Sequence, residues 1–233
     1  MKRRLILISF LIVLILGASI GFISFNKPKT IIAPVEKAPI EVKVNYTNEI
    51  NTLKAKYNNL DVIAYIEIPG VLKEAIAQTT NNDYYLHYDL EKNENIVGAT
   101  FLDYRTKIDE SKKLLVYSHS DPEGTLPFVK LTNYNDKKFF NDNKYIYLVD
   151  KNAKRKYEVF SSYIETSDFD YVNLESFNGL TYKEHLVKLK NKSLVKSNIE
   201  LDEDTKVLIL QTCSFENINA NTKYQLVIAK EIE

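Results

Sequence analysis

Two residues of this chain have side chains suited to nucleophilic catalysis. Cys213 is the only cysteine and ends an apolar run over residues 206–213. His119, one of three histidines, ends a similar run over residues 112–119. A thiol that forms a covalent intermediate and an imidazole that moves its protons make up a cysteine–histidine dyad. The two runs therefore favour cysteine catalysis, and the alternative is that Cys213 is a small buried core residue.

The other residue types exclude several kinds of chemistry. His185 lies within a predicted helix and His87 in an aromatic stretch, so we interpret both as packing or surface residues. Three scattered histidines and one cysteine lack the spacing of a zinc site, and the six glycines form no phosphate-binding loop. We therefore predict neither a metal nor another cofactor. The 31 basic and 31 acidic residues cancel, which argues against nucleic acid as a partner.

The N-terminal sequence predicts a membrane anchor. Basic residues at positions 2–4 precede an uncharged stretch over residues 5–25, about the 20 residues that a helix needs to cross a bilayer. This order predicts a single-pass protein of the cell membrane, with its N-terminus inside and its catalytic domain extracellular. A cleaved signal peptide is the alternative, but its apolar region is shorter, at about 7 to 15 residues.

This interpretation divides the chain into three parts. Residues 1–25 are expected to form a cytoplasmic tip and the anchor. Residues 26–45 contain three of the six prolines and are expected to form an extended extracellular stalk. Residues 46–233 are long enough to form one folded domain with its own core.

The folded part has the pattern of a mainly β domain. Ile50, Leu53 and Tyr57 share one face of a predicted helix at its start, and further helices are expected over residues 137–143 and 181–192. Runs rich in Val, Ile, Tyr and Phe predict strands over residues 62–68, 98–103, 114–118, 145–150, 156–165, 207–212 and 225–232. This pattern favours a closed or nearly closed β-barrel with peripheral helices.

Five stretches carry a resemblance to a known family. They are Tyr65-Ile-Glu-Ile-Pro69, Asn82-Asp-Tyr-Tyr-Leu86, Gly98-Ala-Thr-Phe-Leu-Asp-Tyr-Arg105, Leu115-Val-Tyr-Ser-His119 and Leu210-Gln-Thr-Cys213. In order and spacing they resemble the class B sortases, the membrane-anchored cysteine transpeptidases of Gram-positive cell surfaces. The resemblance covers about residues 50–232.

The resemblance implies a fold and a reaction. The fold is a closed eight-stranded β-barrel with an N-terminal helix and a helix between the sixth and seventh strands. In the implied reaction, Cys213 attacks the Thr-Gly-type bond of a C-terminal sorting signal on a surface protein, with His119 as general acid and base. An amine of the peptidoglycan precursor then resolves the thioester. The implied partners are the sorting-signal peptide, this amine and the membrane.

Substrate contacts of the family carry over loosely to six positions. They are Asn82, Leu86, Tyr171, Val172, Gln211 and Thr212.

One catalytic residue of the family is missing. Sortases have an arginine that opens the last strand, and this chain has no arginine after Arg155. Alignment of the strand end places Tyr224 at that position, and strand alternation turns Lys223 and Gln225 to the other face. Candidate donors to the oxyanion are Arg105, Lys223, Lys230, Tyr224, Gln225 and backbone N–H groups near Cys213.

Three functions therefore stay open. The first is the transpeptidase that the resemblance implies. The second is a catalytically weakened sortase-fold module that binds a sorting peptide without turnover, which the tyrosine at position 224 favours. The third is a cysteine hydrolase that releases the acyl group to water, since both enzymes share the acyl intermediate.

Overall fold

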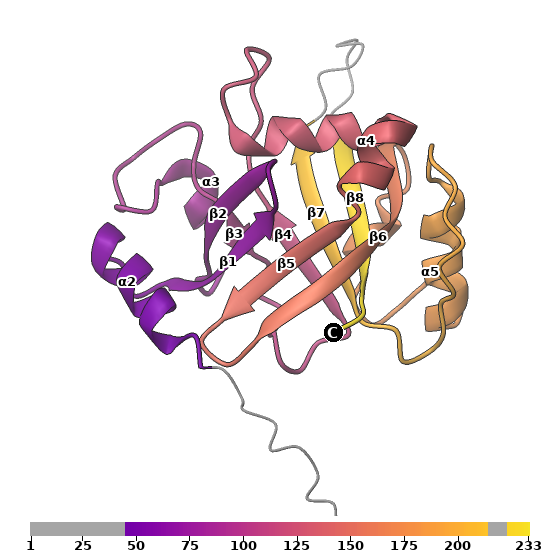
Figure 1. Cartoon of the computed structure of the whole chain (residues 1–233), viewed down its shortest axis with the longest axis horizontal. Coiled ribbons are helices and arrows are strands. Elements are labelled where there is room, and N and C mark those ends of the chain that lie inside the picture. The colour runs from indigo at the N-terminus through magenta and orange to yellow at the C-terminus, as the bar shows by residue number, and fades with distance from the viewer. Residues whose placement is uncertain (1–44, 214–222) are drawn as a thin grey trace, which may run out of the picture. The chain divides into compact units, whose positions relative to one another are not determined.

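The computed structural model describes residues 45–213 and 223–233. In this part of the chain eight strands close into a barrel in the order β1-β2-β3-β4-β7-β8-β6-β5 (Figure 1). The predicted mainly β fold with a closed eight-stranded barrel is confirmed. The strands are β1 (Val62–Ile68), β2 (Leu72–Ala77), β3 (Phe101–Leu102), β4 (Lys113–Tyr117), β5 (Tyr145–Asp150), β6 (Lys154–Glu165), β7 (Val207–Cys213) and β8 (Tyr224–Glu231).

Most neighbouring strands of the barrel are antiparallel. The β5–β6 hairpin turns at residues 151–153, which are polar apart from Ala153. β1 pairs with both β2 and β5, which closes the barrel. Within the described strands two pairs are parallel, β2 with β3 and β4 with β7. The β4–β7 pair matters for function because the carboxyl ends of parallel neighbours lie at the same edge of a sheet.

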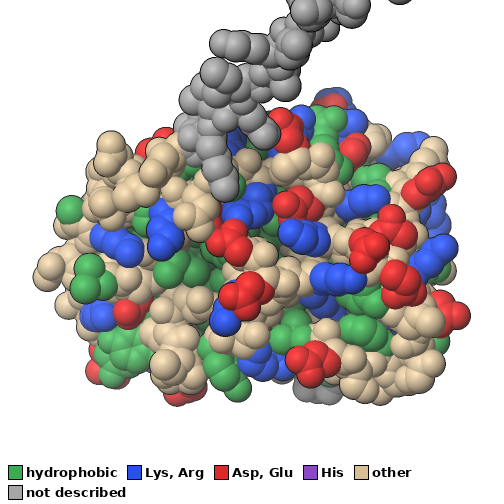
Figure 2. Space-filling model, turned by 90° about the horizontal axis from the view of Figure 1, so that it is seen from below, with side chains coloured by type: hydrophobic (Ala, Val, Ile, Leu, Met, Phe, Trp, Pro, Cys, Tyr) green, Lys and Arg blue, Asp and Glu red, His purple; other side chains and the backbone are tan. Residues whose placement is uncertain are grey.

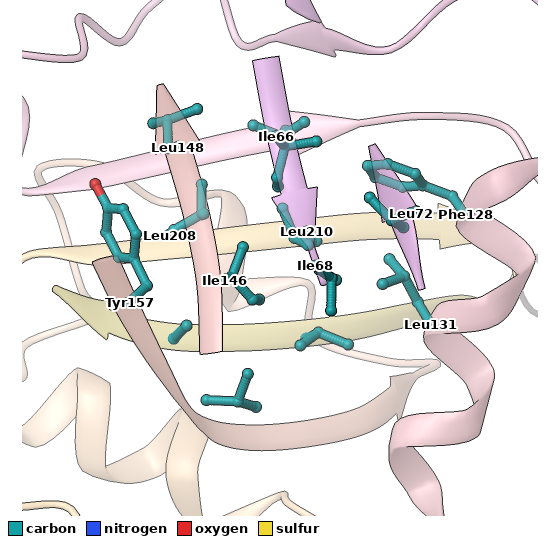
Figure 3. Close-up of a cluster of buried hydrophobic side chains, with 14 of the residues drawn as sticks. Ile66, Ile68, Leu72, Phe128, Leu131, Ile146, Leu148, Tyr157, Leu208 and Leu210 are labelled. Atoms are coloured by element: carbon teal, nitrogen blue, oxygen red, sulfur yellow. The ribbon is translucent and has the colours of Figure 1, made fainter. Parts of the chain in front are cut away.

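Alternate residues of the strands fill the barrel. The interior cluster includes Ile66 and Ile68 of β1, Leu148 of β5, and Leu208 and Leu210 of β7, all almost completely buried. Figure 3 shows these side chains turned toward one another. The 3-10 helix η1 (Pro127–Asn135) adds Phe128, Leu131 and Tyr134 to the same cluster. Burying each large apolar side chain contributes about 1.5–3 kcal/mol, so this interior supplies much of the stability of the barrel.

A second cluster lies on the outer face of β4, β6, β7 and β8. Helix α5 (Tyr182–Asn191) covers this face with Leu186 and Leu189, both fully buried. It begins with a capping box in which Thr181 and Glu184 satisfy each other's backbone N–H groups. The helix predicted over residues 181–192 is confirmed, and it lies between the sixth and seventh strands.

Other helices cover the barrel at different places. In Figure 1, α2 (Thr47–Tyr57) and α3 (Tyr84–His87) lie to the left of the barrel, α5 lies to the right, and η1 and α4 (Lys137–Asp142) lie across the top. Ile50 of α2 packs against Tyr65 and Val149, as its predicted position on the apolar face requires. The helices predicted near Ile50 and over residues 137–143 are confirmed, whereas α3 and η1 were not predicted.

Strand β2 was also not predicted. Its sequence, Leu72-Lys-Glu-Ala-Ile-Ala77, contains Lys, Glu and two Ala, which have low β-propensity. Ala75, Ile76 and Ala77 are nevertheless buried, because β2 pairs with β1 over its whole length. Pairing and burial override local propensity here.

The predicted membrane location needs a correction. Among residues 45–213 and 223–233 no helix is long and apolar enough to span a bilayer. The longest α-helix in that part, α2, has 11 residues, about half the length that a span requires. The prediction of a single-pass membrane protein with an extracellular catalytic domain is therefore wrong on this finding, and an N-terminal membrane contact has no support. Its predicted anchor and stalk, residues 1–25 and 26–45, lie outside the described residues apart from Asn45.

The surface carries charges of both signs. Figure 2 shows Lys and Arg side chains interspersed with Asp and Glu side chains across one face. Exposed ion pairs such as Lys107–Glu110 and Lys138–Asp142 also join charges of opposite sign on the surface. Mixed charges of this kind create no extended field of one sign on the face in view.

Candidate active site

The parallel register of β4 and β7 brings His119 and Cys213 together. Tyr117 and Gln211 are register partners, and the Ser118 N–H donates to the Gln211 carbonyl at 3.2 Å. Two residues further along these parallel segments, His119 follows Tyr117 and Cys213 follows Gln211. Both residues line one pocket of about 270 Å³.

A serine hydroxyl joins the two strand ends. Ser120 follows His119 and is almost buried, and its Oγ donates to the Cys213 carbonyl at 2.7 Å. His119 Nε2 lies 3.2 Å from the Leu86 carbonyl oxygen. Because a carbonyl only accepts, Nε2 is the nitrogen that donates in this contact. These two hydrogen bonds orient the imidazole and the backbone of the cysteine.

The walls of the pocket are mostly apolar. The residues that line it are Asn82, Leu86, Phe101, Tyr117, Ser118, His119, Gln211, Cys213 and Tyr224. The structure therefore brings six of the predicted site residues into one cavity. Phe101, Tyr117 and Ser118 were not predicted as site residues. Tyr117 precedes His119 by two positions, so strand alternation is the signal that would have identified it.

Tyr171 and Val172 lie in an adjoining hollow. They line it with Phe169, and Gln211 and Tyr224 belong to both hollows. The second hollow has a volume of about 370 Å³. The Tyr171 O–H donates to Gln211 Oε1 at 2.7 Å, which connects this wall to β7. The two hollows therefore adjoin at Gln211 and Tyr224.

Thr212 is not part of this surface. Its side chain is 1% exposed, and successive side chains of a strand point to opposite faces. It is therefore turned to the barrel interior, on the face of Leu208 and Leu210, while Cys213 and Gln211 face outward. Thr212 lines neither hollow, and substrate contact by this residue stays a prediction.

The predicted alternation at the start of β8 is confirmed for two residues. Tyr224 is the register partner of Cys213 and lines the pocket. Gln225 is fully buried, and its amide is bonded to Asn135 and to Ser162 Oγ, at 2.9 Å in each case. Gln225 is thus committed to the interior of the barrel. The polar stretch that follows Cys213, residues 214–222, lies outside the described residues.

Two of the candidate cations are also bound elsewhere. Arg105 donates to both carboxylate oxygens of Asp103, at 2.9 and 2.7 Å. Lys230 Nζ donates to the Glu200 carbonyl at 2.9 Å. Among the described residues that line the Cys213 pocket, none is Lys or Arg. A larger hollow of about 500 Å³ lies around Arg105 and Lys113, but it contains neither His119 nor Cys213, so we locate the candidate site by its chemistry rather than by volume.

The thiol is protonated at neutral pH. Burial raises the pKa of Cys213. Desolvation and the neighbouring Cys213 likewise raise the pKa of Tyr224. Cys213 therefore needs a base before it can act as a nucleophile, since the thiolate is the reactive form.

We predict that alkylation of native Cys213 by iodoacetamide is slow at pH 7. The rate is expected to rise about tenfold per pH unit and to keep rising beyond pH 8.5, the pKa of a free cysteine. The same chain unfolded in urea is the control, and its rate is expected to level off near that pH. A native rate that levels off below pH 8 would contradict the raised pKa.

Comparisons with known proteins give relatives that are all sortases of class B. No family model matches the chain. Sortase B of Staphylococcus aureus is 27% identical over 177 residues, which are 75% of this chain and 72% of that protein. Sortase B of Listeria monocytogenes is 28% identical over 160 residues, 68% of this chain and 65% of that protein.

Solved structures of the same kind share the fold. Clostridium perfringens sortase B has a TM-score of 0.70 at 28% identity and covers 78% of this chain and 99% of its own. A sortase B complexed with triglycine has a TM-score of 0.71 at 26% identity, with 81% and 87% covered. The Staphylococcus aureus sortase B–substrate complex has a TM-score of 0.68 at 25% identity, with 80% and 93% covered.

Proposed function

The chain belongs to the class B sortases, a family of cysteine transpeptidases, and on that premise we propose that it transfers surface proteins to a cell-wall amine. The substrate is a C-terminal sorting signal, which is cleaved at a Thr-Gly-type bond. The acceptor is an amine of the peptidoglycan precursor of a Gram-positive cell. The observation that carries the proposal is the β4–β7 register, which supports a dyad of His119 and Cys213 in one pocket.

In the first half of the reaction Cys213 becomes acylated. His119 takes the proton of the thiol, and Sγ attacks the carbonyl carbon of the scissile amide. The resulting tetrahedral oxyanion collapses as the C–N bond breaks. His119 returns its proton to the leaving amine, and the threonine carbonyl stays attached to Cys213 as a thioester.

In the second half an amine replaces the thiol. The acceptor nitrogen attacks the thioester carbonyl while His119 accepts one of its protons. The C–S bond breaks, Sγ leaves as the thiolate, and His119 protonates it, which restores the free enzyme. The products are a new amide and a protonated Cys213, so no cofactor is consumed.

Tyr224 is the proposed substitute for the missing arginine. Its register position opposite Cys213 supports a single phenolic hydrogen bond to the oxyanion. A neutral donor of this kind stabilises the developing charge less than the bidentate guanidinium of arginine. We therefore expect a slow enzyme.

Cleavage of sorting-signal peptides by the full-length chain tests the proposal. We expect mass spectrometry to detect a thioester on Cys213, and we expect added triglycine to attack this thioester and release the acyl fragment as a triglycine adduct. An acyl fragment that forms at the same rate and stays unmodified with triglycine would identify a hydrolase instead.

A binding module is the second candidate function. It is favoured by Tyr224 and by the raised pKa of Cys213, because both lower the reactivity of the dyad. In that case the peptides bind without forming any thioester, although iodoacetamide still labels Cys213. The presence or absence of the thioester on Cys213, measured with the same peptides by mass spectrometry, therefore separates the two functions.

A further inference from the structure

One wall of the candidate site is formed by a segment without strands. Residues 166–181 connect β6 to α5, and the short 3-10 helix η2 (Asp170–Val172) within them carries Tyr171 and Val172 into the second hollow. Phe169 precedes η2 with φ at 49°, the left-handed region that residues with side chains rarely adopt. Contacts from the barrel must therefore hold this wall in place.

Two cations of the barrel bond to successive carbonyls of the wall. Lys113 Nζ donates to the Asn173 carbonyl at 2.6 Å. Arg105 Nη2 donates to the Val172 carbonyl at 3.4 Å. Lys113 is the first residue of β4, and Arg105 follows β3. Both contacts therefore come from the strand pair that also carries Tyr117 into the Cys213 pocket.

Lys113 is built into the protein interior. Its side chain is almost completely buried, and Nζ lies 2.9 Å from His185 Nε2 of α5. The fully buried imidazole of His185 stacks on Phe177 of the wall at 4.5 Å between ring centroids. Burial lowers the pKa of Lys113 to about 7. A neutral amine keeps two N–H groups, so either protonation state can donate to both Asn173 and His185.

Arg105 is held by a buried carboxylate that also contacts the pocket. Asp103 is fully buried, and its carboxylate accepts from Arg105 and, at 2.8 Å, from the Tyr117 O–H. Burial alone would raise the pKa of Asp103, but these hydrogen bonds keep it below its usual value. A continuous polar connection thus runs from Tyr117 through Asp103 and Arg105 to the carbonyl of Val172.

We propose that Lys113 and Arg105 are positioning residues for peptide binding. They set the distance between the wall at Tyr171 and Val172 and the strand that carries Cys213. This inference rests on the proposed function, because the ligand of the wall is the sorting peptide. Neither residue lines the Cys213 pocket, so each acts through the backbone of the wall and leaves the dyad itself unchanged.

Lys113→Met in the full-length chain tests the inference. The substitution keeps the aliphatic stem and removes the donor to Asn173. We expect KM for the sorting peptide to rise about tenfold, with kcat within about twofold, since the loss of one buried hydrogen bond corresponds to roughly that factor. Amide hydrogen exchange over residues 170–174 is expected to accelerate by a similar factor, while the rate of Cys213 alkylation stays the same.

Lys112→Met is the matched control. Lys112 precedes Lys113, but its Nζ contacts the Glu203 carbonyl and Asp204, at 2.7 and 3.0 Å, and not the wall. We expect wild-type exchange and wild-type KM from this variant. It shows whether loss of a lysine at this end of β4 is enough to loosen the wall.

Arg105→Lys is the second variant, in case Lys113→Met does not fold. It keeps a positive charge for Asp103 and shortens the reach to Val172, so the same changes are expected in the same direction. Wild-type exchange and KM in the folded variants would overturn the inference, as would a fall in kcat at unchanged KM. If the wild type turns over no peptide, the proposed function fails, and hydrogen exchange still tests whether Lys113 holds the wall.

Discussion

Cys213→Ala is expected to abolish both peptide cleavage and the covalent intermediate. The chain has no second thiol, and no lysine lines the described pocket to replace it as a nucleophile. Loss of a catalytic nucleophile typically lowers turnover by at least about 10⁴-fold. The measurement is the mass of the intact protein after incubation with the sorting peptide, together with chromatography of the peptide products.

His119→Asn provides the matched comparison for this prediction. It keeps the thiol but removes the base, and we expect turnover to fall about 100- to 10,000-fold, the usual contribution of general acid–base catalysis. Alkylation of Cys213 above pH 9 is expected to persist in this variant, because the thiolate then forms without a base. Cleavage that survives in Cys213→Ala would show that the dyad is not the catalytic site.

Tyr224→Arg is expected to raise kcat/KM about 100-fold. Tyr224 is the register partner of Cys213, and one oxyanion donor is typically worth about 100- to 1,000-fold in rate. A guanidinium beside the thiol would also favour the thiolate, so the pH profile of alkylation is expected to shift to lower pH. Initial rates on the best peptide and the alkylation profile measure the two effects independently.

Lys223→Arg is the control for this gain. It introduces the same guanidinium one residue earlier, and strand alternation predicts that this side chain points to the face opposite to that of Tyr224. We expect no increase in rate from it. An increase in Lys223→Arg without one in Tyr224→Arg would assign the position of the missing arginine to residue 223. If neither variant acylates, the peptide-binding module becomes the better description of this chain.

The strands that the sequence predicts well are those in which burial and propensity agree. β5 and β7 are rich in Val, Ile, Leu and Tyr, and their bounds match the predicted ranges to within one residue. β2 lacks these residue types and becomes a strand through its pairing with β1. The nine-residue helix η1 was missed for a related reason. It is held by the burial of Phe128, Leu131 and Tyr134 on the barrel interior. Their spacing of three residues is the period of a 3-10 helix and not the repeat of an α-helix or a strand.

For the site, too, the features that can be predicted from the sequence are local ones. The chemical types of Cys213 and His119, and their positions after apolar runs, can be recognised in the chain alone, and so can the absence of an arginine near position 224. Alternation along a strand, a local property, correctly separates Tyr224 from Gln225. These features depend on residues that are close together in the sequence.

Other features of the site depend on pairing between distant segments. The sequence does not reveal that β4 lies parallel to β7, and it is this register that brings His119 next to Cys213. It does not reveal that Lys113 is buried against His185, 72 positions further along, and bonded to the wall at Asn173. Such contacts arise because closure of the barrel and the docking of α5 bury these groups together, and a buried polar group must then find its partner within the protein.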